Sequence, residues 1–175
     1  FLGDRGLEDF RMTNQSGTYD RRDGADDMDE FDTLFSALGT MGFDPPELED
    51  LFSVTVACMH ASNVTFKSIS ADESEVDDDN PHLHPLLDLM GWDRNTFNKA
   101  LCYFTIQAGR EKHSRSMPKN KAEIGLQALI KAIYGGIFDF LVKNINLRTA
   151  YKPSAHDKAG SGKAAYIGVL DIFGF

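Results

Sequence analysis

The sequence predicts a mainly α-helical chain with one buried β-strand at its C-terminal end, and two observations support this fold class. Apolar residues recur at intervals of three and four over several long segments, and residues typical of helix starts and ends flank those segments. By contrast, residues 164–172 form a short and almost continuous apolar run, which is typical of a fully buried strand. Because a buried strand needs neighbouring strands, this run indicates that residues 1–175 are part of a larger structure.

The composition is that of a globular protein with an acidic balance. Of the 175 residues, 42% are hydrophobic and 26% are charged, and the net charge is −9. Duplex nucleic acid repels such a chain, so no nucleic-acid partner is expected. No stretch approaches the run of about 18 apolar residues that spans a bilayer, so no transmembrane segment is expected. Cys58 and Cys102 lie in helical apolar patterns and are expected to be reduced core residues of a cytoplasmic protein.

The first long helix is predicted after a polar, Gly-rich segment of loops over residues 1–25. Asp26 or Asp27 is expected to be its N-cap, and Gly42 is expected to end it. Its predicted buried face consists of five apolar residues at helical spacing, namely Phe31, Leu34, Phe35, Leu38 and Met41.

The second helix is predicted to begin at a strong start signal and to end near His60. An acid, two prolines and a second acid stand in the order expected of a capped first turn, Asp44-Pro45-Pro46-Glu47. Residues 63–66 then favour a short strand. The segment that follows, residues 67–82, is acidic and Ser-rich and predicts a surface loop.

Three further helices are predicted in the second half of the chain, over residues 83–90, 93–104 and 119–145. Residues 105–118, between the last two, are polar and have a hairpin-like pattern. Residues 148–163 predict a polar linker into the terminal strand. Two adjacent glycines interrupt the longest helix at a cost of about 1 kcal/mol each relative to alanine. Their presence favours close packing of that helix against a neighbouring element, and a glycine pair that the helix merely tolerates is the alternative.

Charged and histidine side chains offer few specific sites. The basic residues cluster between positions 110 and 121, at Arg110, Lys112, Arg115, Lys119 and Lys121. Such a patch on an acidic chain can bind an acidic partner, and a solvated loop is the plain structural alternative. The histidines lack the spacing of a metal site, and His82 and His84 are expected to be exposed in the acidic segment.

Two motifs near the C-terminus bear on nucleotide binding. Residues 159–165 resemble a phosphate-binding loop, but they lack its first glycine and its hydroxyl residue, and they precede a strand instead of following one. Asp171 lies at the end of the predicted strand, where an acid can hold Mg²⁺ directly or through water. Gly174 can donate its backbone N–H to the γ-phosphate of a nucleotide. A simple strand-end turn is the structural alternative for this Asp-x-x-Gly motif.

Several segments resemble the myosin motor domain, in the order and with the spacing of that family. They are TNQSG at 13–17, DEFDTLFSALGTMGF at 29–43, LFSVTVACMHASNVTF at 51–66, KAIYGGIFDFLVKNIN at 131–146 and VLDIFGF at 169–175. The chain departs from the family at residues 125–131, where an Arg-Asp pair is lost, and at residues 59–63. These departures indicate either a divergent class or relaxed constraint on the sequence.

The resemblance implies that residues 1–175 are a partial motor domain of the P-loop NTPase type, whose parent is α/β. The chain would form the upper part of the central subdomain and end inside the switch II segment. Residues 67–82 would be a variable surface loop, and residues 105–118 a loop that packs on actin. The candidate actin contacts are then Arg110, Lys112 and Arg115.

By the same resemblance, Asp171 would help to hold Mg²⁺ through water and Gly174 would sense the γ-phosphate. The parent would be a cytoplasmic motor of the actin cytoskeleton that couples Mg-ATP hydrolysis to movement, with light chains bound elsewhere. Residues 1–175 alone are expected to be inactive, because they contain neither a phosphate loop nor an Asn-x-x-Ser-Ser-Arg switch I.

Two other function classes are weighed against the motor. One is a truncated or degenerate myosin-like polypeptide without ATPase activity, which is at most a protein-interaction module. The other is an unrelated nucleotide switch such as a GTPase, which needs an upstream phosphate loop and a base-reading motif. Neither motif occurs in residues 1–175.

Overall fold

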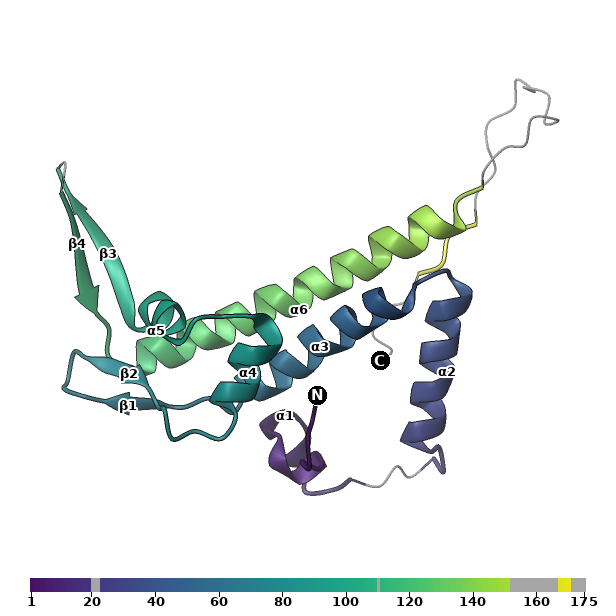
Figure 1. The fold of residues 1–175 in the computed structure, drawn as a ribbon, viewed down its shortest axis with the longest axis horizontal. Helices are drawn as coiled ribbons and strands as arrows, with labels where there is room; N and C mark the ends of the chain where they lie inside the picture. The colour runs from purple at the N-terminus through teal and green to yellow at the C-terminus, as the bar shows by residue number, and fades with distance from the viewer. Residues whose placement is uncertain (20–22, 110, 152–166, 171–175) are drawn as a thin grey trace.

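The computed structural model describes residues 1–19, 23–109, 111–151 and 167–170, which are mainly α-helical. The helices are η1 (Leu7–Asp9), α1 (Arg11–Asn14), α2 (Asp27–Thr40), α3 (Pro45–Ala61), α4 (Leu83–Met90), α5 (Arg94–Cys102) and α6 (Lys119–Thr149). The strands are β1 (Phe66–Ser68), β2 (Ser74–Val76), β3 (Tyr103–Ala108) and β4 (Glu111–Ser116), which form two antiparallel hairpins. Figure 1 shows α3 and α6 side by side, with α4, α5 and both hairpins towards one end and α2 at the other.

The helix starts confirm the capping chemistry that the sequence predicts. The carboxylate of Asp26 accepts the Met28 N–H at 2.8 Å and caps α2. At the start of α3, the Asp44 carboxylate accepts the Glu47 N–H, and the Glu47 carboxylate accepts the Asp44 N–H. These bonds satisfy donors that the first turn of a helix leaves free. Gly42 follows α2 with a φ of 91°, a left-handed angle that favours glycine.

The main hydrophobic core lies where the C-terminal half of α3 meets α4, α5 and the N-terminal half of α6. Leu83 and Leu86 of α4 are at most 1% exposed, and burial of such a side chain contributes about 1.5–3 kcal/mol. Cys58 and Cys102 are free thiols inside this core, as predicted. Burial raises the pKa of both thiols, so both remain protonated and unreactive near neutral pH.

A smaller apolar cluster fills the corner between α2 and α3. Its buried members are Leu38, Phe43, Leu48 and Leu51. Arg148, in the last turn of α6, spans this corner. Its guanidinium carbon lies 4.1 Å from the centre of the Phe43 ring, and its nitrogens donate to the Gly42 carbonyl and the Glu47 carboxylate. The linker predicted over 148–163 therefore begins too early, since residues 148 and 149 are helical; residues 152–163 lie outside the described residues.

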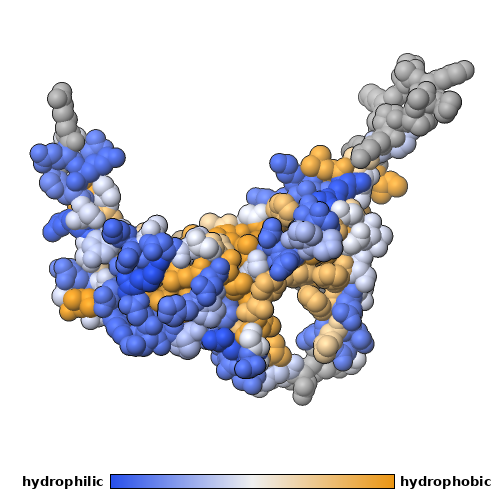
Figure 2. All heavy atoms as spheres, viewed as in Figure 1, coloured by the Kyte–Doolittle hydropathy of each residue, from blue (hydrophilic) through white to orange (hydrophobic). Residues whose placement is uncertain are grey.

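The predicted buried face of α2 is largely exposed. Only Leu38 of that face is buried, whereas Phe31, Leu34 and Phe35 are 44–49% exposed. The rings of Phe31 and Phe35 contact Phe52 of α3, with centroid separations of 5.1 and 6.2 Å. Figure 2 shows apolar surface on this side of α2. The periodicity identifies the correct face, but the single helix α3 covers only part of it.

The C-terminal half of α6 is also little covered. A Cβ atom added at Gly135 or Gly136 would meet no atom of another element within 4 Å, so the predicted close packing is wrong for the described part of the chain. By length and composition alone, α6 could cross a membrane, a test that core helices of soluble proteins also pass. The expectation that no stretch reaches this length is therefore wrong.

The buried strand predicted over residues 164–172 is not present in its described part. Residues 167–170 form no helix or strand, and Ile167, Val169 and Leu170 are 82–97% exposed. A strand needs a neighbouring strand to pair with, and neither hairpin of the described chain pairs with this segment. Residues 164–166 and 171–172 lie outside the described residues.

Residues 67–82 contain more structure than the predicted loop. β1 pairs with β2 in a register that places Phe66 opposite Val76 and Ser68 opposite Ser74. Phe66 and Val76 are 2% and 1% exposed, so they anchor this hairpin to the main core. The strand predicted over 63–66 shares only Phe66 with β1. Because the segment is rich in acidic residues, its composition does not predict that the alternate residues Ser74 and Val76 are buried.

Candidate functional site

The β3–β4 hairpin carries the candidate partner-binding residues. The predicted polar segment 105–118 contains most of β3 and all of β4, which confirms its hairpin-like pattern. The strands pair from Tyr103 opposite Ser116 to Ala108 opposite Glu111, and the hairpin projects away from the helices (Figure 1). Because an isolated two-stranded ribbon is only marginally stable, its direction depends on how its base is held.

Two hydrogen bonds hold the base of this hairpin. The Met117 N–H donates to the Cys102 carbonyl at 2.8 Å, and the Ser74 hydroxyl donates to the Met117 carbonyl at 2.8 Å. Ser74 is only 3% exposed, so water does not compete well for its hydroxyl. The bond from Ser74 therefore joins the two hairpins and fixes the direction in which β3–β4 leaves the core.

The register separates the two described basic residues of the hairpin. Directly opposed residues of antiparallel strands share a face, and neighbours along a strand alternate between faces. Lys112 therefore lies on one face with Gln107, and Arg115 lies on the other with Phe104. The two cations therefore do not share a face of the hairpin.

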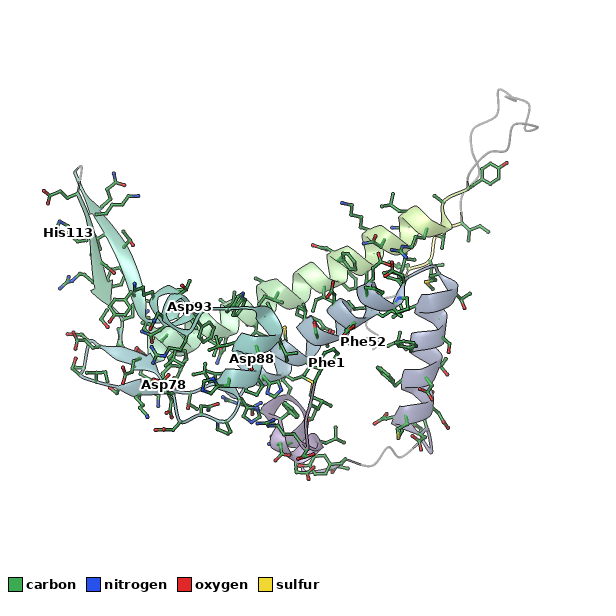
Figure 3. All side chains as sticks on the ribbon, viewed as in Figure 1. Phe1, Phe52, Asp78, Asp88, Asp93 and His113 are labelled. Carbon is green, nitrogen blue, oxygen red and sulfur yellow. The ribbon has the colours of Figure 1, made fainter. Side chains whose placement is uncertain are left out.

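The face that carries Arg115 also exposes apolar side chains. Phe104 is 42% exposed and Ile106 is 37% exposed. His113 lies opposite Ile106 on the same face near the end of the hairpin (Figure 3), and its Nε2 is 3.4 Å from a Glu111 carboxylate oxygen. Aromatic side chains beside an arginine are enriched at protein–protein interfaces, so this face has the composition of a binding surface.

Acidic side chains of the β1–β2 turn lie beside the Arg115 face. Asp72 and Glu73 line a hollow of about 670 Å³ together with Phe104 and Arg115. Arg115 thus has acidic neighbours within its own chain. Lys112 does not line this hollow, so the two cations stand in different electrostatic surroundings.

The acids near the end of the 67–82 segment are ion-paired. Arg94 binds Asp78 through two nitrogen–oxygen contacts of 2.7 Å, and Lys67 lies 2.9 Å from Asp77 and 2.6 Å from Asp79. The hydrogen bond from Arg94 lowers the pKa of Asp78, and the hydrogen bond from Lys67 lowers the pKa of Asp77. These pairs hold the acidic residues against α5 and β1. Fewer unpaired negative charges therefore remain than the predicted surface loop would carry.

The remaining site residues predicted from the sequence lie outside the described residues. They are Arg110, which lies between β3 and β4 in the sequence, and Asp171 and Gly174 of the nucleotide-associated motif. The described residues contain no group of three or more His, Cys, Asp or Glu side chains that could hold a metal ion. The structure therefore leaves the Mg²⁺ prediction at Asp171 untested.

Sequence reasoning missed a buried pair of histidines. The Nδ1 atoms of His60 and His82 are 3.0 Å apart, and the two residues are 0% and 8% exposed. The expectation that His82 is exposed is therefore wrong, because His82 stands at the start of α4 and packs against α3. A signal was available, since Ala57 and Ala61 flank His60 on the same side of α3 and allow a neighbouring helix to approach closely.

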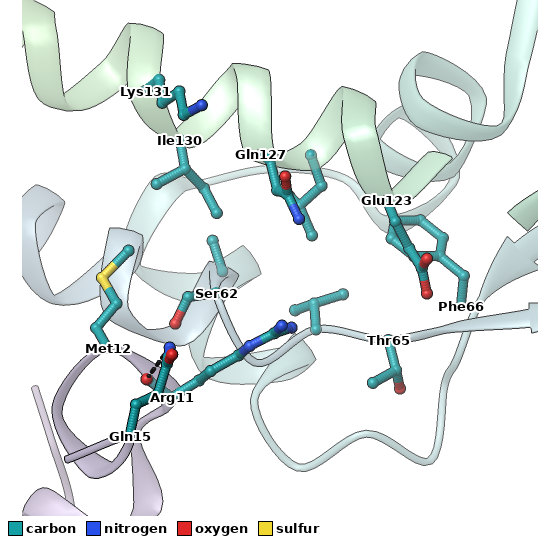
Figure 4. A pocket seen from close by; sticks show the side chains of 13 residues that line it. Arg11, Met12, Gln15, Ser62, Thr65, Phe66, Glu123, Gln127, Ile130 and Lys131 are labelled. Carbon is teal, nitrogen blue, oxygen red and sulfur yellow. Dashed lines mark hydrogen bonds between the residues drawn. The ribbon is translucent and has the colours of Figure 1, made fainter. Parts of the chain in front are cut away.

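A second hollow lies between α1, the C-terminal end of α3 and α6 (Figure 4). Its volume is about 550 Å³. Arg11 and Lys131 supply cations to its lining, Glu123 supplies an acid, and Val64 and Leu126 supply apolar surface. This mixed lining selects no single class of ligand.

Comparisons with known proteins agree on one family. The family model described as Myosin head (motor domain) matches residues 2–175. The chain is 32% identical over 174 residues to Myosin ID heavy chain of Dictyostelium discoideum, which covers 95% of this chain and 15% of that protein. It is 33% identical over 149 residues to Unconventional myosin-Ic-A of Xenopus laevis, which covers 85% of this chain and 14% of that protein.

A plant relative gives the same result. The chain is 31% identical over 169 residues to Myosin-13 of Arabidopsis thaliana, with 95% of this chain and 11% of that protein covered. The chain thus spans 11–15% of the length of these three relatives. Because the family model matches nearly every residue, the chain belongs to the myosin head (motor domain) family.

Proposed function

We propose that the chain is part of an actin-based cytoskeletal motor that couples Mg-ATP hydrolysis to movement along actin filaments. The observation that carries this proposal is the match of the myosin head model to residues 2–175. In this proposal the chain forms the upper part of the central subdomain of a P-loop NTPase motor. The motor works in the cytoplasm on the actin cytoskeleton, and its light chains bind outside these residues.

At its nucleotide end, the chain contributes the start of switch II. Asp171 helps to hold Mg²⁺ through a water molecule, and Gly174 donates its backbone N–H to the γ-phosphate of ATP. The support for these roles is the position of the motif directly after an apolar run in a family member. Other segments of the motor supply the phosphate loop and switch I, since residues 1–175 contain neither sequence motif.

Away from the nucleotide-associated motif, the chain contributes one wall of the actin-binding cleft through the β3–β4 hairpin. The candidate contacts are Arg110, Lys112 and Arg115, which would face acidic side chains of actin. The projection of the hairpin and the exposed apolar face beside Arg115 support this role. Since Lys112 and Arg115 occupy opposite faces, a flat actin surface would bind one of them more strongly than the other.

The experiment that tests both ends is actin co-sedimentation of the full-length protein, with and without Mg-ATP. We expect Lys112→Glu and Arg115→Glu to weaken actin binding unequally, the larger effect being about two- to tenfold for a partly exposed charge contact. We expect Asp171→Ala to raise the Mg-ATP concentration needed for release by about 10- to 100-fold, as for other residues that hold a metal indirectly.

Matched variants separate these effects from charge change alone. Lys143→Glu makes the same charge reversal at an exposed site about 36 Å along α6 from its start. Asp139→Ala removes an exposed acid of the same helix. If both hairpin variants bind actin like Lys143→Glu, the hairpin is not an actin contact. If Asp171→Ala responds to Mg-ATP like Asp139→Ala, the switch II assignment fails.

The second candidate function is a protein-interaction module without ATPase activity. The exposed apolar face of α2 favours it, because such a face can bind a partner without any nucleotide. The mass of the native protein, detected with an antibody to residues 67–80, separates the two candidates. A protein several-fold heavier than 19.5 kDa supports the motor, and a protein of 19.5 kDa supports the interaction module.

A further inference from the structure

A buried aromatic cluster joins the N-terminal segment to the main core. Phe10, between η1 and α1, is 1% exposed and packs edge-on against two imidazoles. Its ring centroid lies 5.2 Å from that of His60 on α3 and 5.5 Å from that of His82 at the start of α4. Phe10 therefore connects a segment of the first 14 residues to two helices that follow much later in the chain.

The contact between the two imidazoles has room for only one proton. Their Nδ1 atoms are 3.0 Å apart, so one must donate an N–H and the other must accept it with a lone pair. A first added proton keeps this bond but leaves a buried positive charge. A second added proton turns both Nδ1 atoms into donors and breaks the bond. The packed arrangement thus requires at least one neutral histidine and is most stable with two.

An added proton on His60 is poorly compensated, because burial lowers the pKa of His60 more strongly than the Phe1 carbonyl raises it. Its Nε2 atom is buried and has no hydrogen-bond partner of normal geometry among the described residues. A buried polar atom without a partner is costly, and a buried charge without one is more so. The site therefore favours the neutral form of the pair by its geometry.

Two hydrogen bonds between the N-terminal segment and the core lie at the surface. The Arg11 N–H donates to the Asn63 side-chain oxygen at 2.9 Å, and the Arg5 guanidinium donates to the Pro81 carbonyl at 2.8 Å. Both bonds are exposed, and water can replace them at little cost. The burial of Phe10 against the histidines is the contact whose loss would free the segment.

We propose that Phe10, His60 and His82 form an acid-sensitive latch, which holds residues 1–14 against α3 and α4 when both histidines are neutral and releases them when the pair is protonated. Release would also remove one wall of the 550 Å³ hollow, because Arg11, Met12 and Gln15 line it from α1 and the residue that follows. This latch does not depend on actin or ATP and stands independently of the motor function.

The charges around the pair set the direction of its response. Burial lowers the pKa of both histidines below the ordinary value of 6.5. For His60, the Phe1 carbonyl raises the pKa, and Arg5 and the N-terminal ammonium lower it further. For His82, Arg5 lowers the pKa and Asp9 raises it. When the segment is released, the two histidines bind protons more readily than they do in the closed latch. The latch is therefore fully closed above pH 6.5 and weakens as the pH falls from 6.5 towards the lowered values.

The test is hydrogen–deuterium exchange of the full chain at several pH values between about 7.5 and 5, expressed as protection factors that remove the intrinsic effect of pH. The reporters are the amides of Arg11, Thr13 and Asn14. The first is bonded to the Asn63 side-chain oxygen, and the other two are bonded to the Phe10 carbonyl. We expect their protection to be constant above pH 6.5 and to fall below it, by up to about tenfold per pH unit for each histidine that gains a proton. Amides of α5 should change little over the same range.

Two variants identify the groups responsible. In the double variant His60→Asn/His82→Asn, the amides can occupy the positions of the Nδ1 atoms and bond to each other without titrating, so the fall in protection should disappear. His84→Asn, at an exposed position of α4, should behave like the unchanged protein. Constant protection in the unchanged protein overturns the proposal, and so does an equal fall in the double variant.

If the double variant does not fold, NMR titration of the histidine ring signals in the unchanged protein decides the matter. We expect the rings of His60 and His82 to titrate below 6.5, together with the release of residues 1–14. A ring that titrates at or above 6.5, or titration that leaves the reporter amides protected, overturns the proposal.

Discussion

Arg148 is a single side chain that connects distant parts of the chain. It stacks on Phe43 and donates to Gly42 and Glu47, which lie about a hundred positions earlier. We expect Arg148→Ala to destabilise the fold by about 0.5–2 kcal/mol from the lost cation–π contact alone. Urea unfolding measures this difference, and Lys143→Ala, which removes an exposed cation of the same helix, is the matched control. Equal unfolding midpoints for the two variants would contradict the prediction.

The same contact gives the corner between α2 and α3 a dependence on acid. The hydrogen bond from the Asp44 backbone lowers the pKa of Glu47 below its ordinary value of 4.5, and the hydrogen bond from Arg148 lowers it further. The stabilising effect of the Glu47 charge is therefore complete above pH 4.5 and is lost as the pH falls through the lowered value. In Glu47→Gln this part of the acid dependence should be missing from a series of unfolding curves.

Among the five described helices of eight or more residues, α2 buries the fewest side chains. It buries only Leu38, and its aromatic side chains are nearly half exposed. Local opening of such a helix costs little free energy, so its amides should exchange at least about tenfold faster than those of α3 in the chain of residues 1–175. Hydrogen exchange read out by mass spectrometry compares the two directly. Equal protection of α2 and α3 would show that α2 opens only with the whole fold.

Over the full chain, exposed apolar surface predicts self-association. Phe31 and Phe35 of α2 and the segment 167–170 are exposed and apolar. Surfaces of this kind associate in water, so sedimentation velocity should show a mass that increases with protein concentration. The double variant Phe31→Ser/Phe35→Ser should reduce this association, and Ser53→Ala is a neutral control. A protein that stays monomeric at high concentration would contradict the prediction.

The sequence predicts a feature well when the residues that determine it lie close together along the chain. The caps at Asp26 and Asp44 were predicted because a cap involves only the first turn of its own helix. The burial of His82 was missed because it depends on His60, 22 positions earlier. The exposure of the α2 face was missed because periodicity reveals which face is apolar and says nothing about what covers it.

In the candidate site too, features set by nearby residues are predictable and features set by distant residues are not. The hairpin was expected from the polar pattern of residues 105–118, and the separation of its two cations was also available in principle. Lys112 and Arg115 are three positions apart, and an odd spacing in a strand places side chains on opposite faces. Side-chain spacing does not test the predicted terminal strand, since its pairing needs strands that the described residues do not supply.

The length of α6 has a mechanical consequence. Its 31 residues form an uninterrupted rod of about 46 Å, whose first turn follows the β3–β4 hairpin and whose last turn is fixed to the α2–α3 corner by Arg148. A tilt of only about 5° about one end would carry the other end through about 4 Å, which is about three-quarters of the rise of one helical turn. A small rotation at the hairpin would thereby become a displacement of a few ångströms at the α2–α3 corner, at the other end of α6 (Figure 1).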